Sequence, residues 1–73
     1  MADSKILRML REDLIGEFNA INQYQQHIDG LSGEAKKTLG HIIADEKEHA
    51  AELAKLIRKL DAAQDEKFRK EGM

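Results

Sequence analysis

Three side chains that bind hard metal ions stand at positions where an apolar residue is expected. Glu17 lies in one helix-forming segment, and Glu46 and His49 lie in the next. A buried carboxylate is costly unless it is paired, protonated or bound to metal. Glu46 and His49 form a Glu-x-x-His motif, whose two ends are neighbours on one face of a helix. The set indicates a metal site; the alternative is a buried polar layer that sets helix register.

Two long helices joined by a short break would bring these residues together. The chain contains no Pro, and Ala, Leu, Glu, Lys and Gln, which favour helices, dominate it. The internal segment that is rich in helix breakers runs from Asp29 to Gly33. We therefore expect helices over about 4–29 and about 33–60, with uncertain ends.

A third, shorter helix is expected after the second. Asp61 is a suitable N-cap for a helix over about 62–70, and Ser32 is a suitable N-cap for the second long helix. The predicted fold is all-α: an antiparallel two-helix hairpin with a short C-terminal helix. Residues 1–73 are expected to form a single half-bundle domain, because a chain this short encloses little core by itself.

Both long segments carry a seam of residues spaced three and four apart. The first consists of Leu7, Leu10, Leu14, Glu17, Ile21, Tyr24 and Ile28, and the second of Leu39, Ile42, Glu46, His49, Leu53, Leu56 and Leu60. Such seams face a partner helix. Further apolar residues lie beside the seams, namely Ile15, Phe18, Ile43, Ala50 and Ile57. A stripe this wide needs more than one neighbour, so we expect dimerisation into a four-helix bundle.

The spacing from the turn places the candidate ligands at one level. Glu17 precedes the centre of the break by about 14 residues and Glu46 follows it by about as many, which corresponds to roughly 20 Å of helix. His49 lies one turn beyond Glu46 on the same face. Tyr24 lies one heptad beyond Glu17 and is either a hydrogen-bond partner of a ligand or part of the core.

Other ionisable residues are weaker candidates. His41, Asp45, Glu48 and Glu52 share an outer helix face, which is predicted to be solvated rather than to be a metal-entry site. His27, near the turn, is predicted to be a surface residue.

Composition excludes several classes of function. The absence of Cys rules out disulfides, zinc-thiolate sites and iron–sulfur clusters. The formal charge is −2 and Lys and Arg form no basic stripe along the sequence, which argues against nucleic-acid binding. No apolar run approaches a membrane span and no apolar signal region precedes Lys5, so a cytoplasmic protein is expected.

The seam segments resemble the metal-binding helices of ferritin-like and rubrerythrin-like proteins. Leu14–Tyr24 (LIGEFNAINQY) is similar to the first of those helices, and Asp45–Leu53 (DEKEHAAEL) is similar to the second. A two-helix version with a short tail is similar to the encapsulated ferritins. The resemblance covers roughly residues 6–70 and depends most on Glu17, Tyr24, Glu46 and His49.

The resemblance implies an iron-oxidising centre formed between two subunits, with two iron ions per dimer. Glu17 and His49 would be terminal ligands and Glu46 the bridging carboxylate, with Tyr24 close to the reacting centre. Members of that family assemble from dimers, as in a decameric ring, and reside in an encapsulin shell that stores the mineral. The implied activity is ferroxidase, in iron storage or detoxification.

Two departures qualify the resemblance. Relatives often place extra carboxylates beside the first-helix Glu, where this chain has Gly16 and Asn19. The chain stops at Met73 without a shell-targeting tail, which leaves truncation, excision from a fusion, and absence of a shell as alternatives.

Other functions use the same residues. A non-enzymatic hairpin module for oligomerisation, a zinc or manganese bundle, and a peroxide-reducing di-iron protein are the alternatives. Without Cys the chain has no rubredoxin-type centre to return electrons, which favours net iron oxidation over peroxide reduction.

Overall fold

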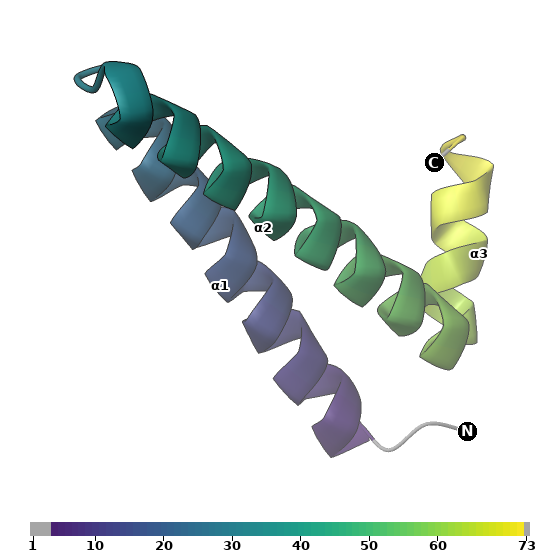
Figure 1. Cartoon of the computed structure of the whole chain (residues 1–73). Coiled ribbons are helices and arrows are strands. Elements are labelled where there is room, and N and C mark those ends of the chain that lie inside the picture. The colour runs from purple at the N-terminus through teal and green to yellow at the C-terminus, as the bar shows by residue number, and fades with distance from the viewer. Residues whose placement is uncertain (1–3, 73) are drawn as a thin grey trace.

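The described part of the chain, residues 4–72 of a computed structural model, contains three helices and no strands (Figure 1). They are α1 (Ser4–Ile28), α2 (Gly33–Leu60) and α3 (Ala62–Lys70). α1 and α2 run antiparallel from a tight turn, and α3 leaves the far end of α2 at an angle (Figure 1). The predicted all-α hairpin with a short C-terminal helix is therefore confirmed.

The turn between the long helices is closed by backbone hydrogen bonds. The Gly30 N–H donates to the His27 carbonyl at 3.1 Å, and the Leu31 N–H donates to the Ile28 carbonyl at 3.0 Å. Gly33 begins α2 with a φ of 58°, a left-handed conformation that Gly adopts without the steric penalty of a Cβ. Ser32 occupies the N-cap position as expected, but its side chain makes no capping hydrogen bond.

The seam predicted on α1 faces α2 along its whole length. Leu7 is buried, and the remaining members are half-buried: Leu10, Leu14, Glu17, Ile21, Tyr24 and Ile28. Most residues between them, including Ile15 and Phe18, are exposed. The spacing of three and four therefore identified the contact face of this helix correctly.

The contact face of α2 differs from the predicted seam at every second position. Ile43, Ala50 and Ile57 are the buried residues of this helix, whereas Ile42 and Leu56 are more than a third exposed. The residues expected beside the seam are thus the ones that face α1. α2 is thus rotated about its axis relative to the predicted packing, so that Ile42, His49 and Leu56 lie on the open side of the hairpin. The apolar stripe of α2 is wider than the surface that one neighbouring helix can cover, so only one side of the stripe packs against α1 and the other stays exposed.

The helix breaks at Asp61, whose backbone is extended, and α3 begins at the next residue. As predicted, the Asp61 carboxylate caps α3, and it accepts a hydrogen bond from the Gln64 N–H at 3.1 Å. Arg58 of α2 donates from Nε to the Asp65 carboxylate at 2.9 Å and lies 5.2 Å from the centre of the Phe68 ring. α3 is thereby tied to α2 by charge as well as by packing.

The molecule is thin, with extents of 48 × 27 × 15 Å, and no large side chain of the described residues is fully buried. Many large apolar side chains are therefore exposed: Ile6, Met9, Ile15, Phe18, Leu31, Ile42 and Leu56. No described helix has the length and apolar character needed to cross a membrane.

Candidate metal centre

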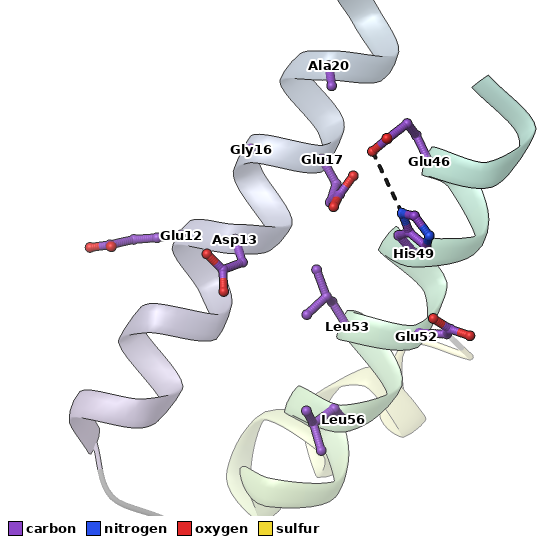
Figure 2. A pocket seen from close by; sticks show the side chains of 10 residues that line it. All are labelled: Glu12, Asp13, Gly16, Glu17, Ala20, Glu46, His49, Glu52, Leu53 and Leu56. Carbon is purple, nitrogen blue, oxygen red and sulfur yellow. Dashed lines mark ion pairs between the residues drawn. The ribbon is translucent and has the colours of Figure 1, made fainter. Parts of the chain in front are cut away.

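Glu17, Glu46 and His49 meet in the groove between the two long helices (Figure 2). One ligand atom from each lies within 4.8 Å of the others. Glu17 points from α1 toward α2, and Glu46 and His49 point back from successive turns of α2 (Figure 2). Within residues 4–72 this is the one group of three or more His, Asp or Glu side chains with that geometry.

The hairpin register produces this convergence. Both glutamates lie at a similar distance from the turn, because the two helices leave it in antiparallel directions. Glu46 and His49 are one turn apart, with 4.0 Å between the Glu46 Oε2 and the His49 Nδ1. That separation is too long for a hydrogen bond and leaves both atoms able to contact a shared ion.

The three side chains differ in their exposure to solvent. The Glu46 side chain is 22% exposed and that of His49 is 53% exposed. Glu17 is half-buried on the α1 seam. The candidate centre therefore has a protein wall on one side, formed by the hairpin, and is open on the other.

The groove around the centre is strongly acidic. It has a volume of about 680 Å³ and is lined by Glu12, Asp13, Gly16, Glu17, Ala20, Glu46, His49, Glu52, Leu53 and Leu56. Five of these residues carry carboxylates and none is Lys or Arg. Carboxylates gathered without a basic neighbour repel one another and attract cations.

The donor set fits a divalent first-row metal ion. Carboxylate oxygen and imidazole nitrogen together suit iron, manganese and zinc, and oxygen donors favour the higher charge of Fe(III). Ferritin-like di-metal centres use two Glu ligands and two Glu-x-x-His pairs. One chain supplies half of that set, through Glu17, Glu46 and His49.

Three other sets of residues considered from the sequence lie outside the group formed by Glu17, Glu46 and His49. Tyr24 is half-buried on α1 and does not line the groove, and its hydroxyl makes no hydrogen bond with the described residues. His41, Asp45 and Glu48 are exposed on α2 and form no metal-binding group within residues 4–72. His27 is exposed, as predicted.

Sequence reasoning missed one wall of the groove. Asp13 lies one turn before Glu17 and points toward the groove, whereas Glu12 points away from α2 (Figure 2). The spacing of four between Asp13 and Glu17 was a usable signal, because residues four apart share a helix face. Glu52 is exposed, as expected from the sequence, and lies at the outer edge of the groove with its side chain pointing away from α1 (Figure 2).

Comparison with known proteins gives two matches. The model of the EncFtn-like family matches residues 2–71. The chain is also similar to the encapsulin nanocompartment cargo protein EncC of Myxococcus xanthus (strain DK1622), with 42% identity over 65 residues. That alignment covers 88% of this chain and 50% of the relative, so the chain spans about half the length of the curated protein it matches. No solved structure matches the chain significantly.

Proposed function

Because the chain belongs to the EncFtn-like family of encapsulated ferritin-like proteins, we propose that it is a ferroxidase whose centre forms between two copies. Fe(II) is the substrate, and each chain supplies Glu17, Glu46 and His49. The observation that carries the proposal is the convergence of these ligands within 4.8 Å in an acidic groove that is open on one side.

The open side supports pairing with a second copy. The His49 side chain is 53% exposed there, and Ile42 and Leu56 flank it on α2 at 38% and 40% exposure. A symmetric pair of hairpins would cover these apolar residues and complete a four-helix bundle. It would also place the second Glu, Glu and His opposite the first, with the metal ions near the two-fold axis.

Each ligand has a chemical task in this scheme. Glu46 would bridge two ions, while Glu17 and His49 would each hold one. Two Fe(II) ions lose one electron each, and dioxygen takes both electrons and two protons to give hydrogen peroxide. With peroxide as the oxidant, the same two electrons and two protons give two molecules of water. The remaining groove carboxylates, led by Asp13, would draw Fe(II) in and offset its charge.

The compartment is also part of the proposal. The relative from Myxococcus xanthus is named as cargo of an encapsulin nanocompartment. We place this protein in the same setting, inside a protein shell in the cytoplasm, where the ferric product would be retained.

Anaerobic metal binding followed by exposure to air tests the function. Calorimetry with Fe(II) should give one ion per chain, and air should then produce ferric absorbance in the near ultraviolet. Glu17→Ala and His49→Ala should lower both the stoichiometry and the rate of oxidation. Glu48→Ala is the matched control, because Glu48 sits inside the same motif but is exposed and does not line the groove.

The same measurements separate the competing readings. Uptake of Zn(II) or Mn(II) without iron oxidation would favour a redox-inactive metal bundle. Absence of saturable binding of any of these ions would sink the metal centre and favour a structural polar layer. In that case Glu17→Ala should raise the stability of the assembly, since a buried charge would be removed without loss of a ligand.

A further inference from the structure

A second groove, on the other side of α2, has the opposite electrostatic character. It lies between α2 and α3, has a volume of about 720 Å³, and is lined by Ala51, Ala54, Lys55, Arg58, Lys59, Asp65 and Arg69. Four of these residues are cationic and one is anionic. Successive residues of a helix are about 100° apart, so the lining residues that belong to α2 lie on the side of that helix turned away from Glu46 and His49.

The charge of this groove is opposite in sign to the formal charge of the whole chain. The formal charge of the protein is −2, yet four of the seven residues that line this groove are cationic and only one is anionic. The groove around the candidate metal centre carries five carboxylates and no Lys or Arg. The two grooves therefore differ in charge: the first is predominantly anionic and the second predominantly cationic.

The ion pairs within the groove involve its arginines but not its two lysines. Asp65 is shared by two guanidinium groups: Arg58 Nε lies 2.9 Å from its Oδ1, and Arg69 Nε lies 3.0 Å from its Oδ2. This arrangement fixes both arginines at the rim of the groove. Lys55 and Lys59, one turn apart on α2, have no carboxylate partner among the described residues.

The floor of the groove is small and apolar. Ala51 and Ala54 have only methyl side chains, which leave the space between α2 and α3 open beneath the longer basic side chains. A compact oxyanion could enter this hollow and be met by the ammonium groups of Lys55 and Lys59 on α2 and by the guanidinium group of Arg69, whose side chain is 76% exposed, on α3. Guanidinium groups bind phosphate oxygens in pairs, and lysine adds a mobile point charge.

We propose that the groove between α2 and α3 is an anion site that binds phosphate, either as the free ion or as a phosphomonoester. At neutral pH such a group carries a charge of about −1.5 to −2, which the predominantly basic lining would attract. Its place on the far side of α2 keeps the anion site separate from the acidic groove. The proposal is independent of iron chemistry.

Phosphate titration of the metal-free chain of 73 residues tests the site. Amide spectra recorded by NMR in the presence of EDTA should show saturable shifts at Ala51, Ala54 and Arg69, with none at Glu17. Sodium chloride at equal ionic strength should not reproduce them. Parallel titrations with inorganic phosphate and glycerol phosphate decide which source of the group binds more tightly.

Two variants of equal charge change make the result decisive. Lys55→Gln with Lys59→Gln should weaken phosphate binding about tenfold, as expected for the loss of two exposed ion pairs. Lys36→Gln with Lys37→Gln removes the same charge from exposed positions outside the groove and should change the affinity less than about twofold. Circular dichroism checks that each variant is folded. Equal weakening in both variants, or shifts that chloride reproduces, would overturn the proposal.

Discussion

The guanidinium of Arg11, on α1, donates a hydrogen bond to the carboxylate of Asp61, the residue that ends α2 and caps α3. Residues 50 positions apart are thereby joined at the open end of the hairpin. The Asp61 side chain is 19% exposed and that of Arg11 is 46% exposed. One carboxylate therefore ties α1 to the α2–α3 corner and satisfies the first turn of α3.

Substitutions at Asp61 separate its two roles. Asp61→Asn keeps a good N-cap but loses the charge pair, and should lower the free energy of unfolding by about 0.5 kcal/mol. Asp61→Ala loses both and should cost roughly 1–3 kcal/mol. Urea denaturation measures both values. A double-mutant cycle with Arg11→Ala should give a coupling energy for Asp61→Asn; a coupling of zero would contradict the ion pair.

Gly40 offers a stabilising change far from both grooves. It lies inside α2, and a Cβ built there would meet only the Ile28 Cδ1, at an ordinary contact distance of 3.8 Å. Gly40→Ala should therefore stabilise the protein by about 1 kcal/mol through helix propensity, raising Tm by roughly 4–8 °C. Thermal denaturation followed by circular dichroism checks this. A lower Tm would mean that the α1–α2 contact near the turn is tighter than the structure indicates.

Oligomerisation should depend on the apolar edge of the metal-binding side. Leu56 is 40% exposed beside the groove, and a symmetric dimer would bury it twice. Leu56→Asp should therefore raise the dimer dissociation constant about 100-fold or more, while Leu56→Met, which keeps volume and character, should change it little. Sedimentation equilibrium measures both.

Metal that bridges two chains should strengthen the same assembly by linkage. Adding Fe(II) under anaerobic conditions should lower the dimer dissociation constant of the wild-type protein, and EDTA should reverse the change. Glu48→Ala should respond as the wild type does, whereas His49→Ala should not respond. A monomer at micromolar concentration with and without Fe(II) would contradict the shared centre.

Much of this arrangement could be predicted from the sequence because its signals are local. Helix formers without Pro predicted the helices, the Asp29–Gly33 break predicted the turn, and the spacing of Glu17, Glu46 and His49 predicted their convergence. The packing of α2 could not be predicted in the same way. Its apolar stripe is wide enough to offer either Ile42 and Leu56 or Ile43 and Ile57 to α1, and the partner surface decides between them.

The tertiary role of the α3 corner also lay beyond sequence reasoning. Asp61 was recognisable as a cap from its position before a helical segment. Its pairing with Arg11 requires α1 to lie beside the junction of α2 and α3, and this arrangement exists only in the folded chain. The basic groove has the same origin, because Lys55 and Arg69 line one groove only when the chain bends at Asp61 and α3 leaves α2 at an angle.

Removing a single ligand should affect iron oxidation unequally at the two glutamates. Glu46 would contact both metal ions and Glu17 only one, so Glu46→Ala should abolish oxidation more completely than Glu17→Ala. Stopped-flow absorbance after mixing Fe(II)-loaded protein with oxygenated buffer measures the rates, with Glu48→Ala as the control for loss of a negative charge. Near-normal oxidation by Glu46→Ala would contradict its bridging role.

Iron supplied well beyond two ions per dimer should not remain soluble with the protein alone. A stored mineral needs an enclosing cavity, and the described hairpin is a thin body of 48 × 27 × 15 Å whose groove is open on one side. Pairing across that groove would close the metal centre but leave no interior for a mineral. We therefore expect the purified protein to oxidise excess Fe(II) in air and to yield a ferric precipitate. Soluble mineral is expected when an encapsulin shell is present. Size-exclusion chromatography and electron microscopy of the soluble fraction distinguish these outcomes, and closed particles with electron-dense cores formed by the protein alone would show that its oligomer encloses a cavity after all.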